Sequence, residues 1–229
     1  MGMTKEPVSP PPARAEFRWI PIRSLSSRHR PRILAHLLSL GESDRYLRFG
    51  YHASDTQVGS YVDRLDFDRD EVFGVFNRKL ELIAMAHLAY QHVTAGPGRE
   101  EHNEAEFGVS VQKKARGRGY GSRLFDHAVL HARNRHVDTM IIHALTENSA
   151  MLRIVHNAGA TIDREGGDAE ARLKLPPESL GTHVDQILQE QAAEVDYQLK
   201  HGARQFDALL DIFSDVRARI GDVRSKRIE

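Results

Sequence analysis

The chain has 229 residues, 40% of them hydrophobic, and its 32 basic residues balance 32 acidic ones. This length and composition suffice for one sizeable domain with an appendage, and zero net charge does not favour nucleic acid or an anionic membrane surface as a partner. Because cysteine is absent, disulfides, thiolate metal sites and a cysteine nucleophile are excluded.

The N-terminal end, residues 1–15, predicts a disordered tail, because it contains Pro10-Pro11-Pro12 and no apolar segment. No stretch of the sequence approaches the roughly 18 apolar residues of a membrane-spanning helix. We therefore expect a soluble, cytoplasmic protein without a membrane partner.

The apolar pattern of the N-terminal half predicts a strand at 17–23, helices at 32–40 and 54–65, and a hairpin of strands at 71–76 and 80–90 with a tight connection at 77–79. A polar loop at 95–104 follows. Loops of this kind are exposed and can border a site.

The next segment, residues 116–124, reads Arg-Gly-Arg-Gly-Tyr-Gly-Ser-Arg-Leu and joins an apolar strand at 105–111 to an amphipathic helix at 120–135. The first amides of a helix lack intrahelical acceptors and carry the positive end of its dipole, so such a turn can bind a phosphate. Glycine lets the backbone approach a ligand closely. The segment therefore predicts an anion site.

Two common phosphate loops fit this segment poorly. A Walker loop ends in Gly-Lys-Ser/Thr, where this chain has Gly121-Ser122-Arg123, and a Rossmann loop needs a glycine at the position of Ser122. The pattern Arg116-x-x-Gly119-x-Gly121 instead resembles the pyrophosphate loop of the GNAT N-acetyltransferase superfamily, whose form is Gln/Arg-x-x-Gly-x-Gly/Ala.

Three further pieces carry the resemblance. Residues 105–111 look like the family's central strand, residues 139–145 read as a buried strand, and residues 147–160 are similar to its Asn-led helix that closes with glycine. Residues 44–49, Asp-Arg-Tyr-Leu-Arg-Phe, look like the segment between the first two helices in GNAT domains of bacterial protein-lysine acetyltransferases.

The resemblance implies an α/β (α+β) GNAT fold with a mixed central sheet flanked by helices, over residues 16–176. It also implies acetyl-CoA as the cosubstrate and an amine as the acceptor. The cofactor-binding residues that it implies are the backbone amides of Val109 and Val111 for pantetheine, Asn148 beside them, and the loop residues Arg116, Gly117, Arg118, Gly119, Tyr120, Gly121 and Ser122.

The catalytic residue that we expect is Glu106, which lies where the family often keeps a carboxylate base. A lysine amine has a pKa near 10.4, so a base must remove its proton before direct attack on the thioester. Glu104 shares the strand parity of Glu106 and is the substitute candidate, while a solvated surface charge is the alternative for both.

The family's usual acid, a tyrosine seven residues after Asn148, is replaced by Val155. Tyrosine-assisted protonation of the leaving thiolate is therefore in doubt, and solvent, Tyr120 or direct thiolate departure remain as options. Asn148 has a second interpretation as a helix N-cap.

The 13 histidines do not form a recognisable metal motif. His127 and His131 stand four apart on a predicted helix, but no glutamate follows His127 as in the zinc motif His-Glu-x-x-His. We expect no metal.

The C-terminal residues, 177–229, predict a helical extension that begins after Pro176-Pro177. Apolar residues recur every seven positions in two series, Ala192, Leu199, Phe206, Phe213, Ile220 and Val195, Gly202, Leu209, Val216, Val223. The helices could pack on their own domain or form a homodimer, and Gly202 interrupts the seam.

Two functions follow from these patterns. The first is an acetyl-CoA-dependent N-acetyltransferase acting on a protein lysine or a small amine. The second is a non-catalytic acyl-CoA-binding domain that acts as an interaction module. Glu106 favours the enzyme and Val155 favours the binding module.

Overall fold

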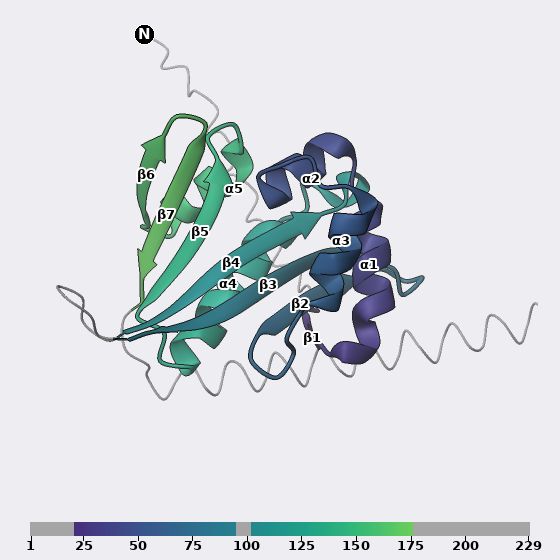
Figure 1. Cartoon of the computed structure of the whole chain (residues 1–229), viewed down its shortest axis with the longest axis horizontal. Coiled ribbons are helices and arrows are strands. Elements are labelled where there is room, and N and C mark those ends of the chain that lie inside the picture. Colours follow the sequence, from purple (N-terminus) through teal and green to yellow (C-terminus); the bar gives the residue numbers. More distant parts are fainter. Residues whose placement is uncertain (1–20, 95–101, 176–229) are drawn as a thin grey trace, which may run out of the picture.

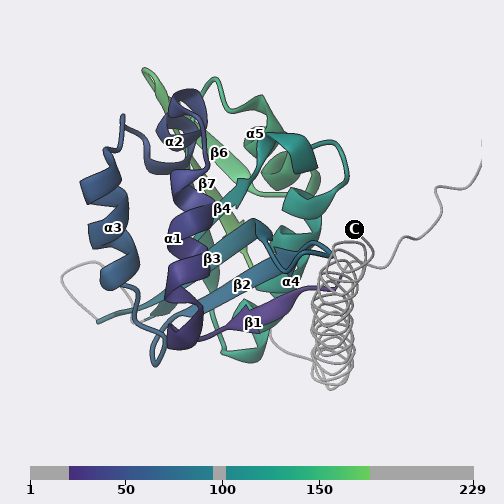
Figure 2. The same cartoon turned by 90° about the vertical axis from the view of Figure 1, so that its right-hand side faces the viewer.

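Short apolar runs alternate with amphipathic segments along the chain, and they fold into a sheet with helices on both faces (Figures 1 and 2). The computed structural model describes residues 21–94 and 102–175. Its strands are β1 (Arg23–Leu25), β2 (Glu71–Phe76), β3 (Leu82–Val93), β4 (His102–Val111), β5 (Thr139–Leu145), β6 (Thr161–Glu165) and β7 (Asp168–Lys174). Its helices are α1 (Arg30–Leu38), α2 (Glu42–Phe49), α3 (Asp55–Asp63), α4 (Tyr120–Asn134) and α5 (Ser149–Asn157), with short 3-10 turns at Ser27–His29 and Lys113–Ala115.

The described strands form one seven-stranded sheet in the order β1-β2-β3-β4-β5-β7-β6. All neighbours are antiparallel except β4 and β5, which run parallel. These two strands pair only where Glu104, Ala105 and Glu106 face Thr139, Met140 and Ile141. Beyond Glu106 they diverge, as Figure 1 shows, and the predicted mixed sheet is confirmed.

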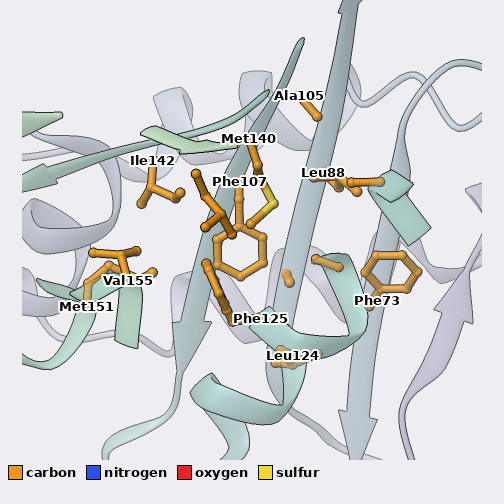
Figure 3. Packing of buried hydrophobic residues seen from close by; sticks show 14 of the residues in the cluster. Phe73, Leu88, Ala105, Phe107, Leu124, Phe125, Met140, Ile142, Met151 and Val155 are labelled. Atoms are coloured by element: carbon orange, nitrogen blue, oxygen red, sulfur yellow. The ribbon is translucent and has the colours of Figure 1, made fainter. Parts of the chain in front are cut away.

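Each face of the sheet buries its own apolar cluster. Helices α1 and α3 cover one face and α4 covers the other (Figure 2). On the α4 side, the rings of Phe107 and Phe125 meet edge to face with centroids 5.3 Å apart, and both side chains are almost fully buried (Figure 3). Burial of a side chain of this size contributes roughly 1.5 to 3 kcal/mol, so β4 is held firmly at the centre of the fold.

Residues 44–49 lie between α1 and α3, the counterparts of the two helices expected from the sequence, and they form a helix of their own, α2, that was not expected. The helix starts after Gly41 and ends at Gly50, whose φ of 77° is the left-handed conformation typical of a helix end. Glu42 and Asp44 in its first turn interact favourably with the positive end of the helix dipole.

Other predicted boundaries also differ from the structure, including those of the helices expected at 32–40 and 54–65, which are Arg30–Leu38 and Asp55–Asp63. Residues 17–20 of the first expected strand lie outside the described residues, and β1 begins at Arg23. Strand β3 begins at Leu82 after a connection that includes Leu80 at a φ of 57°. Strand β4 begins at His102, so the end of the predicted polar loop is extended and paired with β3. The strands at 139–145 and 71–76 and the helix at 120–135 are confirmed within a residue.

The predicted tail at 1–15 and helical extension at 177–229 lie outside the described residues. The homodimer expected from that extension therefore stays a prediction. In the described ranges, 21–94 and 102–175, no helix is both long enough and apolar enough to cross a membrane.

A buried histidine ties α1 to the sheet. The Nδ1 atom of His36 lies 2.9 Å from the carbonyl oxygen of Leu82, and its Nε2 atom lies 2.8 Å from Oγ of Ser110. The ring is neutral when Nδ1–H donates to Leu82 and Nε2 accepts from Ser110. Burial lowers the pKa of His36 from 6.5 to about 4.

This low pKa predicts acid sensitivity. The unfolded chain binds a proton at His36 below about pH 6.5, and the folded chain does not until about pH 4, so stability falls as pH falls through this window. We expect this residue alone to cost roughly 2 kcal/mol of unfolding free energy between pH 7 and pH 5. Urea unfolding at both pH values should show a smaller pH effect in His36→Gln than in wild type. The exposed His156→Gln is the matched control, and identical pH effects in all three proteins would contradict the prediction.

Candidate active site

A cleft of about 1310 Å³ opens where β4 and β5 diverge. Its walls come from α2, α3, the carboxyl end of β4, the glycine loop with the start of α4, β5, α5 and the β6–β7 hairpin. Among the residues that the structure describes, the divergence leaves the β5-facing edge of Val109 and Val111 without a strand partner, while β3 pairs with their other edge. An extended ligand can therefore add to β4 as a strand would.

The cleft gathers nearly all the residues that the sequence singled out. Those that line it are Glu106, Val109, Val111, Arg116, Gly117, Gly119, Tyr120, Gly121, Ser122 and Asn148. Glu104 and Arg118 are not among the lining residues.

The glycine loop presents its backbone to one end of the cleft. Gly117 and Gly119 have φ values of 72° and 77°, and a Cβ atom built on either would meet nothing within 4 Å. Within the described part of the chain, the amides from Gly117 to Ser122 make no backbone–backbone hydrogen bond. Free amides at a helix N-terminus suit a phosphate, so the loop fits the pyrophosphate of CoA.

Arg116 ties this loop to its surroundings. Its Nη2 atom lies 2.5 Å from Oδ1 of Asp44 in α2, and its Nε atom donates to the carbonyl oxygen of Val111 at 3.3 Å. The guanidinium thus holds α2, β4 and the loop together. The backbone amides remain the groups that are free to meet an anion.

The two candidate bases lie in different surroundings. Glu106 is exposed and lines the cleft, whereas its neighbour Phe107 is buried on the opposite face of β4. Glu104 is bound by its neighbours, with His102 Nε2 2.9 Å and Arg172 Nη1 3.9 Å from its Oε1 atom. The geometry therefore favours Glu106 as the group that can reach an acceptor.

Helix α5 explains two further residues. Asn148 is its N-cap, and the side-chain oxygen of Asn148 accepts a hydrogen bond from the Met151 amide at 3.2 Å. Val155 is fully buried in the cluster on the α4 side of the sheet (Figure 3). The position that carries a tyrosine in the family pattern is thus filled here by a core side chain.

The cleft also borders a partly buried polar chain that sequence reasoning missed, made of Arg48, Tyr61, His87 and Asp70. Arg48 Nη2 donates to the Tyr61 hydroxyl at 3.0 Å, and that hydroxyl lies 2.9 Å from Nδ1 of His87. His87 Nε2 lies 3.1 Å from Oδ2 of Asp70. Arg48 and Tyr61 line the cleft.

The protonation states of this chain follow from its burial. Burial raises the pKa of Tyr61 against the opposing effect of Arg48, and burial together with Arg48 lowers the pKa of His87. Burial opposes ionisation of Asp70, but hydrogen bonds from Arg69 and His87 hold its pKa below the ordinary value. A neutral His87 accepts from Tyr61 and donates to Asp70, so every donor in the chain points toward the Asp70 carboxylate.

The histidine pair considered as a metal motif lies in the core. His127 and His131 are buried, and their rings pack against Phe73 with centroid distances of 4.7 Å and 4.6 Å. No group of three metal-ligating side chains occurs among residues 21–94 and 102–175.

Solved structures share this architecture. The GNAT domain of S. lividans PAT is 24% identical, aligns over 67% of this chain and 89% of its own, and has a TM-score of 0.54. A putative acetyltransferase from Acinetobacter baylyi is 17% identical over 69% of this chain and 93% of its own, also with a TM-score of 0.54. At these identities the likeness concerns the fold. A comparison with curated proteins found no match.

A family assignment comes from the sequence profile described as "Acetyltransferase (GNAT) domain", which matches residues 20–161. The matched region holds β4, the glycine loop, α4, β5 and α5, which together form most of the cleft. It covers more than half of the chain, and the fold agrees with it. The chain therefore belongs to the GNAT acetyltransferase family.

Proposed function

We propose that this chain transfers an acetyl group from acetyl-CoA to a primary amine on a protein lysine or a small molecule, with Glu106 as the general base. One observation carries the proposal: a single cleft joins the amide-lined glycine loop to the exposed Glu106 carboxylate. The loop amides can bind the CoA pyrophosphate, and the carboxylate can take a proton from the amine.

The proposed reaction is a direct transfer. Glu106 removes a proton from the acceptor ammonium, because an alkylamine with a pKa near 10.4 is protonated near neutral pH. The backbone amides of Val109 and Val111 hold the pantetheine arm along the open edge of β4. Bound acetyl-CoA supplies the activated thioester.

The bond changes balance without a covalent enzyme intermediate. The neutral amine attacks the thioester carbonyl and the new C–N bond forms. The nitrogen then loses its second proton to solvent, and the C–S bond breaks to release CoA thiolate. Val155 cannot protonate this thiolate. Solvent or the Tyr120 hydroxyl, which comes from the cleft wall, provides the proton.

The test measures CoA release from acetyl-CoA against a panel of small amines and lysine peptides, with acetyl-CoA binding followed separately by calorimetry. We expect turnover with at least one acceptor class and saturable binding of acetyl-CoA. Binding without turnover on any acceptor would contradict the catalytic proposal.

That contradicting result is the one expected of the second candidate function, a non-catalytic acyl-CoA-binding domain. The burial of Val155 at the family tyrosine position is the observation that favours it. Such a protein would bind acetyl-CoA equally well with Glu106 or with glutamine at that position, and it would show no acetyl transfer with either.

A further inference from the structure

An arginine from α2 lines the same cleft as Glu106, the base in the proposed function. Helix α2 lies beside the carboxyl end of β4 (Figure 1), and the Arg48 guanidinium lies directly over Gly108. A Cβ atom at Gly108 would come within 2.7 Å of Arg48 Cζ, so only glycine leaves room for the guanidinium there. Gly108 is two residues from Glu106, on the same face of the strand.

The guanidinium is fixed in place on two sides. Its Nη2 atom donates to Tyr61, and the polar chain behind Tyr61 ends at Asp70, which Arg69 also binds at 2.7 Å. The Arg48 Cζ atom lies 5.2 Å and 5.5 Å from the ring centroids of Phe49 and Tyr61. Cation–π contacts of this kind hold a guanidinium while leaving its edge free to donate.

Most of its donors are unused. Among the described residues, Nη2 is the one nitrogen of Arg48 with a hydrogen-bond partner, and Nε is buried without one. No carboxylate in residues 21–94 or 102–175 forms an ion pair with Arg48. Hydrogen-bond donors of a partly buried cation that lack acceptors cost free energy. The arrangement therefore fits an anionic group that arrives with a ligand.

The opposite wall of the cleft has the opposite charge. The β6–β7 hairpin contributes four carboxylates and one arginine, Arg164, to the lining, so the negative charges outnumber the positive one. The carboxylates are Asp163, Glu165, Asp168 and Glu170, of which Glu170 is paired with Arg172. Together with Glu106 they favour a ligand ammonium, whereas Arg48 favours a ligand carboxylate. A ligand that carries both groups would be oriented by this cleft.

Resting on the proposed function, we propose that Arg48 binds a carboxylate of the acceptor. The acceptor is then an amine that also carries a carboxylate, either an amino acid or a lysine residue with an acidic neighbour. Positions 106 and 108 lie about 7 Å apart along the strand, so the amine can meet Glu106 while the carboxylate meets Arg48. A guanidinium fork matches the two oxygens of a carboxylate.

The test compares acceptors that differ only in the carboxylate. The pairs are lysine with cadaverine, phenylalanine with phenethylamine, and a lysine peptide with an aspartate or an asparagine neighbour. CoA release is measured with wild type and with Arg48→Met. The same pairs are titrated calorimetrically into protein saturated with CoA.

We expect wild type to prefer the carboxylate member of a pair, and Arg48→Met to raise its KM by about 10- to 100-fold. The partner without the carboxylate should change by less than about twofold. Arg48→Lys, which keeps the charge without the fork, should recover part of the loss, and Tyr61→Phe should weaken the preference in the same direction. Arg64→Met removes an exposed arginine outside the cleft and is the matched control.

Two results would overturn the proposal. One is equal KM values for both members of every pair in wild type. The other is an equal loss of kcat for both members in Arg48→Met, which would mean that Arg48 acts on the thioester. If no amine is acetylated, only the proposed function is contradicted, and the calorimetric titrations then test the Arg48 site. Tighter binding of the carboxylate member of a pair that is lost in Arg48→Met supports the site. Equal binding of both members by wild type refutes it.

Discussion

Replacing Glu106 by glutamine should lower kcat by about 10²- to 10⁴-fold and leave acetyl-CoA affinity nearly intact. Glutamine keeps the size of the side chain and removes its ability to accept a proton. Glu106 is exposed at the cleft wall, away from the glycine loop, so the change should not disturb the fold. Steady-state CoA release and calorimetric binding of acetyl-CoA measure the two quantities.

The deficit should shrink as pH rises, because a larger fraction of the acceptor amine is then already neutral. Glu104→Gln is the matched control, since Glu104 lies two residues away, is bound by His102 and Arg172, and does not line the cleft. Equal activity of Glu106→Gln and wild type at neutral pH would remove Glu106 from the mechanism. A large loss in Glu104→Gln alone would transfer the role to that residue.

The glycine loop and its neighbours could be predicted closely because their signals are local. Alternating glycines mark the turn, and the helix after it was expected at 120–135 and is Tyr120–Asn134. The strand at 139–145 is Thr139–Leu145, since a short apolar run between polar residues leaves little choice of boundary. The position of Glu106 on the face of β4 opposite Phe107 follows from strand parity alone.

Helix α2 was missed because its signal is weak. Its sequence, Glu-Ser-Asp-Arg-Tyr-Leu-Arg-Phe, has few apolar residues, and no residue of the helix is fully buried. The glycines at its two ends, Gly41 and Gly50, mark its boundaries and could have indicated it. Its importance lies in Asp44 and Arg48, which both line the cleft.

The polar chain behind Arg48 could not be predicted from local patterns. Arg48, Tyr61 and His87 come from α2, α3 and β3, and Asp70 precedes β2. Each alone resembles an ordinary surface or core residue. Only the packing of α2 and α3 against the same face of the sheet brings them within hydrogen-bonding distance.

The glycine loop should lose affinity for acetyl-CoA when a side chain keeps the phosphates away from its backbone. We expect Gly119→Val to raise the Kd for acetyl-CoA by at least about 10-fold, which corresponds to the loss of one hydrogen bond to a charged group. Gly119 is the N-cap of α4 with a φ of 77°, and the space beside it within the cleft is open. A valine there would occupy the space of the phosphate and would strain the loop backbone.

The strain must be separated from the steric block, because a left-handed valine destabilises a fold wherever it occurs. Gly159→Val provides that control: Gly159 has a φ of 83°, has nothing within 4 Å of its Cβ position, and lies outside the cleft. Both variants should unfold at lower denaturant concentration than wild type, by roughly 1 to 3 kcal/mol. Only Gly119→Val should lose acetyl-CoA affinity in calorimetry. If the folded Gly119→Val protein binds acetyl-CoA as tightly as Gly159→Val does, the pyrophosphate does not bind at this loop, and the amides from Gly117 to Ser122 need another explanation.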